Sequence, residues 1–175
     1  SENDGGYFEV LATNGNTFLG GDDFDRLIVE HWIQSNNIAV DTVDKQLMQT
    51  LRLKAETAKK HLSTNDIFED KINDIVCRLS VSEFETLITP LVNETIVCCK
   101  NALRDAGLKI GDIDTIVMVG GSTRTPFVKK SITEFFNKPV NDSLNPDEVV
   151  ALGAAIQADI LAGNQKDMLL LDITP

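Results

Sequence analysis

Apolar residues recur along the first half of the chain with the period of helices that bury one face. After Gly20-Gly21 the spacing predicts a helix that begins near Asp22 and ends at Asn36-Asn37, with a second helix over residues 44–62. The apolar stripe of the first helix holds Phe24, Leu27, Ile28, His31 and Trp32, and that of the second holds Leu47, Leu51, Ala55, Ala58 and Leu62. The chain therefore begins its central part with two amphipathic helices.

A change of period follows. Residues 66–70 and 74–79 predict a short hairpin, in which Ile75, Cys77 and Leu79 alternate with polar residues and point inward. Ser80 and Glu83 then form a capping box, so a helix follows. Pro90 is expected to kink or restart that helix near Thr89. Its second piece carries a buried stripe of Val92, Ile96, Cys99, Leu103 and Ala106 and ends at Gly107.

The last third has the pattern of α/β structure. Residues 115–119 form a continuous apolar run, typical of a strand covered on both faces, and residues 7–13 also favour a strand. A helix with Pro126 near its first turn follows, and we expect it to bury Val128, Ile132 and Phe135. Another helix begins at residues 145–148 and is closed by Gly163. The run Leu169-Leu170-Leu171 has two interpretations, a last edge strand or an apolar linker that docks on this domain and leads into another.

The pattern shifts near residues 21 and 95, which suggests one subdomain inserted into another. We predict an α/β fold in which residues 1–20 and 96–167 form an α/β subdomain. Residues 21–95 are then an inserted helical and hairpin subdomain of α+β type.

Composition excludes several classes of partner. Lys and Arg number 16 against 27 Asp and Glu, a formal charge of −11, which argues against a nucleic-acid or anionic membrane surface. No run approaches the ~18 apolar residues of a membrane-spanning helix. The polar N-terminus has no signal-peptide layout, and we expect the chain to be cut from something longer. Its three cysteines are an odd number without a Cys-x-x-Cys pair, which predicts reduced thiols in a cytoplasmic protein, with Cys98 and Cys99 in core packing. His31 and His61 lie in separate helices, so we expect no metal site.

The strongest candidate for chemistry follows the apolar run at Val119, where two glycines open a helix: Gly120, Gly121, Ser122 and Arg124. Such a turn leaves backbone N–H groups free and lets a ligand approach closely, and a guanidinium can stack on a base. The alternative is a tight turn followed by an ordinary helix start. Known phosphate-loop and nucleophile signatures are absent, so we assign no catalytic residue.

A second candidate lies on one face of the helix over residues 44–62. Glu56, Lys59, Lys60 and Ser63 are spaced by three, four and seven, so they share that face. The alternative is a solvated face with ion pairs. Nearby, Asp22, Asp23 and Asp25 could bind a divalent cation, but acids at a helix start more commonly serve the helix dipole.

Five motifs in order closely resemble the seventy-kilodalton heat-shock chaperone family over essentially the whole chain. They are Leu19 to Asp25, Ala55 to Ser63, Val119 to Arg124, Asn145 to Ala155, and Leu169 to Asp172. The resemblance is to the second lobe of that family's actin-like (ribonuclease H-like) ATPase domain, with residues 168–175 as the start of an interdomain linker. Residues 88–92 and 155–161 look more like the bacterial branch specialised for iron–sulphur cluster assembly.

The resemblance implies that adenosine lies between the two subdomains. Glu56 and Lys59 would take the ribose hydroxyls, and Ser63 would meet the adenine amino group. Lys60 stands where many relatives have an arginine that stacks on adenine. The other side of the pocket would be lined by Gly120, Gly121, Ser122, Arg124 and Asp147.

The resemblance also implies a parent protein larger than this chain. The parent would be an ATPase that binds ATP or ADP with magnesium and works with a J-type co-chaperone on an iron–sulphur scaffold or an unfolded client. We expect its first lobe and its peptide-binding domain to lie outside this chain, which alone should not hydrolyse ATP. Alternatives are a general-purpose chaperone of the same family, a lobe of an actin-like small-molecule kinase, and a non-enzymatic binding module built on the helical middle.

Overall fold

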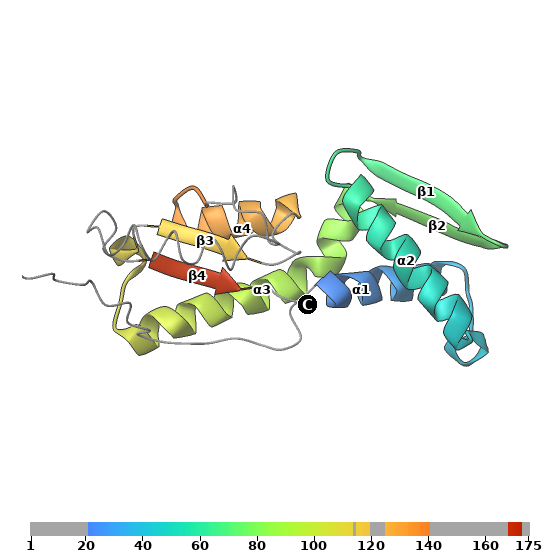
Figure 1. Ribbon diagram of the computed structural model, residues 1–175, viewed down its shortest axis with the longest axis horizontal. Coiled ribbons are helices and arrows are strands. Elements are labelled where there is room, and N and C mark those ends of the chain that lie inside the picture. Colours follow the sequence, from blue (N-terminus) through green and yellow to red (C-terminus); the bar gives the residue numbers. More distant parts are fainter. Residues whose placement is uncertain (1–20, 114, 120–124, 141–167, 173–175) are drawn as a thin grey trace, which may run out of the picture.

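The computed structural model describes residues 21–113, 115–119, 125–140 and 168–172 (Figure 1). Within them, helices α1, α2 and the beginning of α3 lie with the hairpin β1–β2 at one end of the elongated molecule. The rest of α3 lies at the other end with β3, β4 and α4. We call these the helix–hairpin half and the sheet half. The mixed α/β class predicted from the sequence is confirmed.

Helices α1 (Gly21–Ser35) and α2 (Lys45–His61) have nearly the bounds that the sequence predicts, and the short 3-10 helix η1 (Val40–Thr42) lies between them. Asn37 adopts a left-handed conformation after α1, with φ 54°. Asp44 caps α2 by accepting a 2.7 Å hydrogen bond from the Leu47 backbone N–H. The predicted stripes are buried except for Leu27, His31 and Leu47, which are half-buried.

Strands β1 (Ile67–Ile72) and β2 (Ile75–Ser80) form the predicted antiparallel hairpin, closed by Asn73 and Asp74. Ile75, Cys77 and Leu79 are buried and alternate with exposed residues, which confirms the inward face. This face packs on the helices, since β2 contacts α1 and α3 and β1 contacts α2.

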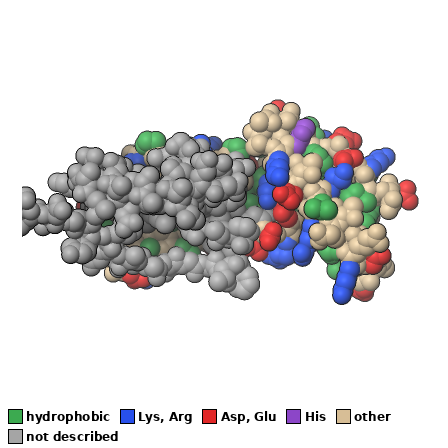
Figure 2. Space-filling view, viewed as in Figure 1, with side chains coloured by type: hydrophobic (Ala, Val, Ile, Leu, Met, Phe, Trp, Pro, Cys, Tyr) green, Lys and Arg blue, Asp and Glu red, His purple; other side chains and the backbone are tan. Residues whose placement is uncertain are grey.

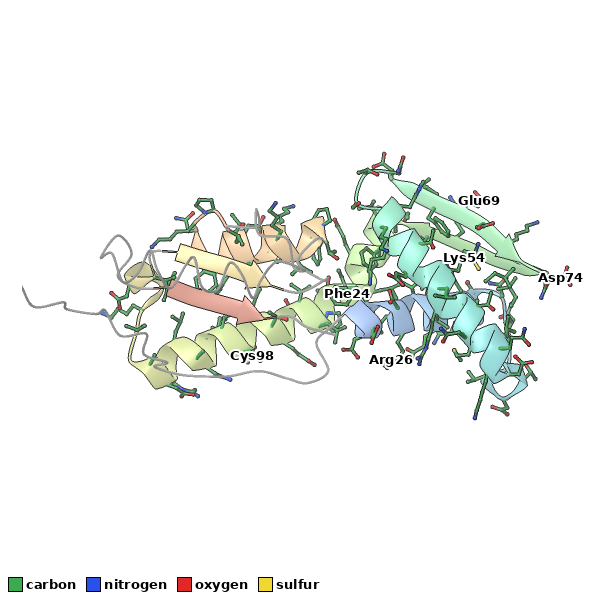
Figure 3. The ribbon with its side chains drawn as sticks, viewed as in Figure 1. Phe24, Arg26, Lys54, Glu69, Asp74 and Cys98 are labelled. Carbon is green, nitrogen blue, oxygen red and sulfur yellow. The ribbon has the colours of Figure 1, made fainter. Side chains whose placement is uncertain are left out.

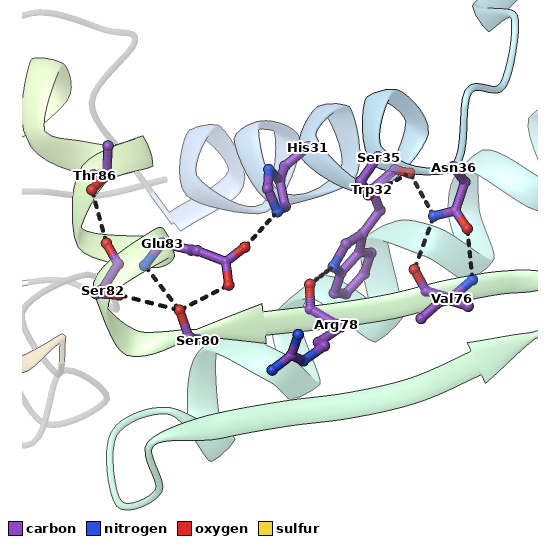
Figure 4. Close-up of polar contacts among 10 residues, drawn as sticks. All are labelled: His31, Trp32, Ser35, Asn36, Val76, Arg78, Ser80, Ser82, Glu83 and Thr86. Carbon is purple, nitrogen blue, oxygen red and sulfur yellow. Dashed lines mark hydrogen bonds and ion pairs between the residues drawn. The ribbon is translucent and has the colours of Figure 1, made fainter.

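Side-chain hydrogen bonds to the backbone fasten α1 to β2 (Figure 4). Trp32 is fully buried, and its indole Nε1 donates to the Arg78 carbonyl at 2.9 Å. The Asn36 amide donates to the Val76 carbonyl and accepts from the Val76 N–H, both at 2.9 Å. The hairpin therefore has a fixed register against the helix as well as a buried face.

Helix α3 (Val81–Ala106) joins the two halves. Ser80 caps it, since its Oγ accepts from the Glu83 N–H at 3.1 Å and donates to Glu83 Oε1 at 2.9 Å. The helix continues through Pro90, so it does not restart, and it changes direction along its length (Figure 1). Gly107 ends it in a left-handed conformation with φ 69°, as the sequence predicts. The proposed boundary at residue 95 falls inside this helix and stays a prediction.

In the sheet half, the 3-10 helix η2 (Ile110–Asp112) leads to β3 (Thr115–Val119), which pairs in parallel with β4 (Met168–Asp172). Of the two interpretations of the leucine run, a strand is the one observed. Its role as a linker is a separate prediction.

Helix α4 (Pro126–Phe136) has Pro126 at its start, as predicted. It buries Val128, Ile132 and Phe136, and Phe135 is half-buried and packs against the same core, so the predicted core face is confirmed with Phe136 as its more deeply buried aromatic residue. The reason is the period, because Phe136 continues the i, i+4 row of the other two residues and Phe135 lies off it. The strand predicted at residues 7–13 and the helix predicted from residue 145 lie outside the described residues.

Candidate functional site

The described part of the candidate site lies at the C-terminal end of α2, in the helix–hairpin half. Glu56, Lys59 and Lys60 belong to the last two turns of the helix, and Ser63 follows it. Five other predicted site residues, Gly120, Gly121, Ser122, Arg124 and Asp147, lie outside the described residues. The structure therefore bears on one side of the predicted pocket.

Three of the α2 residues form an exposed surface. Glu56 Oε1 lies 3.1 Å from Lys60 Nζ, an i, i+4 ion pair whose side chains are 47% and 71% exposed. The Ser63 hydroxyl donates a 2.6 Å hydrogen bond to the Lys60 carbonyl, and Ser63 is exposed. An exposed pair of this kind contributes only about 0–1 kcal/mol to stability, so these side chains are available to a ligand at little cost.

Lys59 is placed differently from its neighbours. Its Nζ lies 2.9 Å from Asp25 Oδ1 in the first turns of α1, and the two side chains are only 15% and 13% exposed. The Asp25 oxygen is buried and has no well-aligned hydrogen bond, so the ammonium satisfies it by charge. The predicted common face is thus divided, with Lys59 directed to the crossing of two helices and Glu56 and Lys60 directed to solvent.

The electrostatics of Asp25 reflect this position. Burial raises its pKa above the ordinary value, and the hydrogen-bonding and charge contribution of Lys59 opposes that rise. The negative charges of Glu56 and Asp22 raise the pKa of Asp25 further, which places both carboxylates near it. A cluster of acids with one partly buried ammonium therefore joins α1 to α2.

The sequence singled out Asp25 only as a helix-start acid or a cation ligand and missed its partner. Asp23 lies 3.9 Å from Arg26, so two of the three acids near the start of α1 have cationic side chains beside them. No local pattern links Asp25 to Lys59, because the two belong to different helices. Across the described ranges, no group of three or more His, Cys, Asp or Glu side chains is arranged to hold a metal ion.

The charged side chains of the helix–hairpin half are interleaved by sign rather than gathered (Figure 2). Arg26 on α1 pairs with Glu30 at 3.3 Å, and Lys54 on α2 pairs with Asp70 on β1. Figure 3 labels Arg26 and Lys54 on their two helices. No helix within the described residues is long and apolar enough to cross a membrane.

The cysteines are packing residues where the structure describes them. Burial raises the pKa of Cys77 to about 11 and that of Cys99 to about 12, so both stay thiols near neutral pH. Cys98 is half-buried, and none of the three forms a disulfide. The predicted reduced state and the core position of Cys99 are confirmed.

Comparison with known proteins identifies the family. The model of the family described as "Hsp70 protein" matches residues 2–175. This chain belongs to the Hsp70 family. The resemblance inferred from the five motifs is thereby confirmed, and the family match leaves the kinase-lobe alternative without support.

Three relatives within the Hsp70 family carry the name HscA or HscA homolog. The chain is 47% identical to "Chaperone protein HscA homolog" of Shewanella frigidimarina and 48% identical to the protein of that name from Vibrio cholerae. It is 45% identical to "Chaperone protein HscA" of Cronobacter sakazakii. Each match covers 97% of this chain and 28% of the relative, so the chain spans about 28% of the length of these Hsp70 proteins.

Proposed function

We propose that this chain is the adenosine-binding lobe of an ATP-dependent molecular chaperone that acts in the maturation of iron–sulphur proteins. The observation that carries the proposal is the match of residues 2–175 to the Hsp70 family, with relatives named HscA. The fold would be the second lobe of an actin-like ATPase, with residues 21–95 inserted between residues 1–20 and 96–167. The parent would work in the bacterial cytoplasm.

The chemistry of the α2 end supports a nucleoside ligand. A carboxylate and an ammonium, Glu56 and Lys59, can accept from and donate to a pair of ribose hydroxyls. The Ser63 hydroxyl can accept from the adenine amino group, and the Lys60 side chain can lie along the base. This set pairs hydroxyl-binding charged groups with a neutral hydroxyl, which suits a sugar and a base.

The other side of the pocket would come from the turn after β3. Gly120, Gly121, Ser122 and Arg124 would line the base and Asp147 would support the ribose side. Because β3 ends at Val119, this turn follows the carboxyl end of a parallel strand, the edge at which α/β sheets bind their ligands. Phosphates and magnesium would be held by the parent's other lobe.

Pairing of β4 with β3 supports a coupling role for the tail. The proposed linker begins at residue 168, and its strand β4 pairs with β3. Since β3 leads into the proposed nucleotide turn, the linker and the site would share one sheet. Nucleotide-dependent closure of the parent would change the affinity of the lobe for this strand, and by linkage the strand would change nucleotide affinity. Clients would then be held or released according to the bound nucleotide.

The partners follow from the HscA branch. The parent would act with a J-type co-chaperone on an iron–sulphur scaffold protein. A general-purpose folding chaperone of the same family is the second candidate, and stimulation of the full-length ATPase by unfolded protein but not by a scaffold would favour it.

Calorimetry with ADP tests the adenosine site. In the full-length protein, Glu56→Ala should weaken ADP binding about tenfold, as expected for one charge-assisted hydrogen bond. Glu69→Ala removes the same charge from the exposed face of β1 and should leave the affinity within about twofold. The isolated 175-residue chain should bind ADP far more weakly than the full-length protein. Equal, tight binding by both, or an unchanged affinity in Glu56→Ala, would refute the proposal.

A further inference from the structure

The Lys59–Asp25 pair differs from the other ion pairs of the described residues in its burial. The two side chains are 15% and 13% exposed, whereas in every other described pair of a Lys or Arg with an acid at least one side chain is more than a third exposed. A pair at the surface is screened and adds little, but a pair withdrawn from water is held strongly and loses much when one partner is removed.

The position of the two partners reinforces their contact. Asp25 lies near the N-terminus of α1, where the helix dipole favours an anion, and Lys59 lies in the last turn of α2, where it favours a cation. Helix packing between α1 and α2 brings these two ends together. The Lys59 ammonium is therefore held by a carboxylate from another helix, α1. Glu56 and Lys60 instead pair with each other within α2.

Holding a lysine in one conformation matters for binding. A free lysine side chain has many rotamers, and a ligand that fixes its ammonium must overcome the loss of that entropy. A lysine already fixed by a buried partner can contact a ligand without that loss. Asp25 also lies near enough to Glu56 for their charges to interact, so it acts on both residues proposed for the ribose.

We propose that Asp25 is a positioning residue for ribose recognition, which acts by fixing the Lys59 ammonium at the crossing of α1 and α2. This inference rests on the proposed adenosine site and adds to it a residue that contacts no ligand. An ordinary structural ion pair would hold the helices together and affect every ligand alike. Loss of a positioning pair instead weakens the binding of ligands that have ribose hydroxyls and spares ligands that lack them.

The test compares ADP with 2′,3′-dideoxy-ADP by calorimetry on the full-length protein. Asp25→Asn keeps the shape and removes the charge, so it should weaken ADP about tenfold and the dideoxy analogue less than twofold. Asp25→Glu keeps the charge but moves the carboxylate outward. The ratio of its affinities for ADP and the dideoxy analogue should lie between the ratio of the wild type and that of Asp25→Asn. Glu30→Gln removes an exposed charge from the same helix, away from Asp25, and serves as the control, with discrimination unchanged.

The outcomes separate two failures. If Lys59→Met leaves ADP affinity unchanged, the adenosine site itself is wrong and this inference falls with it. If Lys59→Met weakens ADP but Asp25→Asn does not, or if Asp25→Asn weakens both ligands equally, only the positioning role is overturned. Should Asp25→Asn fail to fold, Asp25→Glu decides alone, because equal losses for the two ligands, or none, overturn the role.

Discussion

The two halves of the molecule are built on different kinds of contact. In the helix–hairpin half, neighbouring segments of residues 21–81 pack on each other, and side chains such as Trp32 and Asn36 reach the backbone of β2. In the sheet half, β3 pairs in parallel with β4, although residues 120–167 separate the two strands along the chain. Among the elements that the structure describes, only α3 belongs to both.

This difference shows which of the proposed binding residues are fixed by segments that lie near them in the sequence. The α2 residues proposed for adenosine are fixed by elements near them in sequence, which form at low loop-closure cost. The turn after β3 depends on a strand pairing that closes a long loop. The proposed site would therefore combine one side whose contacts are local in sequence with another that depends on distant parts of the chain.

Breaking the helix–hairpin half should have the largest effect on stability. Trp32→Ala removes a fully buried indole and its bond to the Arg78 carbonyl, so it should lower the free energy of unfolding by about 3–5 kcal/mol. Trp32→Phe keeps most of the ring but leaves the carbonyl without its donor, so it should cost less, about 1–3 kcal/mol. Chemical denaturation followed by circular dichroism measures both, and a loss below 1 kcal/mol in Trp32→Ala would contradict the packing described.

A core substitution in the sheet half should lower the free energy of unfolding somewhat less, and it should also destabilise the helix–hairpin half. Ile132 is fully buried on α4, and Ile132→Ala should cost about 2–5 kcal/mol. Trp32 is the single tryptophan and lies in the other half. Because α3 is continuous, the unfolding midpoint followed by Trp32 fluorescence should fall in Ile132→Ala as much as the midpoint followed by circular dichroism. Lys130→Ala on the exposed side of α4 is the control, with a change within about 0.5 kcal/mol. An unshifted fluorescence midpoint in Ile132→Ala would mean that the halves unfold separately.

The smallest expected effect concerns acid stability at the start of α3. The pKa of Glu83 is lowered from its ordinary value of 4.5, chiefly by the Ser80 hydrogen bond and also by His31, whose Nε2 lies 3.1 Å from the carboxylate. The stabilisation is complete above pH 4.5 and is lost as pH falls through the lowered pKa. It should amount to less than about 1 kcal/mol, because solvent screens this partly exposed side chain.

Unfolding curves at pH 7 and at pH 3 measure that contribution. Glu83→Gln should remove it, and Ser80→Ala should reduce it while also losing a pH-independent helix cap worth about 1 kcal/mol. If Glu83→Gln loses as much stability as the wild type between the two pH values, Glu83 has no part in the acid response.

The sequence predicted most of the described elements because their signals are local. Asp44 and Ser80 marked the starts of α2 and α3, alternation marked β2, and Gly107 marked the end of α3. Phe135 packs against the core as predicted, but the more deeply buried Phe136, which the prediction left out, follows the i, i+4 row of Val128 and Ile132.

The candidate site was predicted as a single face of α2, and here local spacing was insufficient. Spacing places Glu56, Lys59 and Ser63 near one another, but it cannot say which side chain a neighbouring helix will attract. The structure directs Lys59 to Asp25 and leaves Glu56 with Lys60. The residues predicted for the other side of the pocket stay predictions.

By itself, the sequence determined the apolar stripes of α1 and α2, the Ser80 cap and the Gly107 end of α3, the inward face of the hairpin, and, through five ordered motifs, the Hsp70 family. Only the tertiary structure decided that α1 supplies the carboxylate for Lys59, that β4 pairs with β3, and that one helix passes through Pro90 to join the halves. The reason is the separation along the chain of the residues that interact. Hydrogen bonds within a turn are set by adjacent residues, whereas burial and charge pairing between distant segments depend on how the whole chain packs.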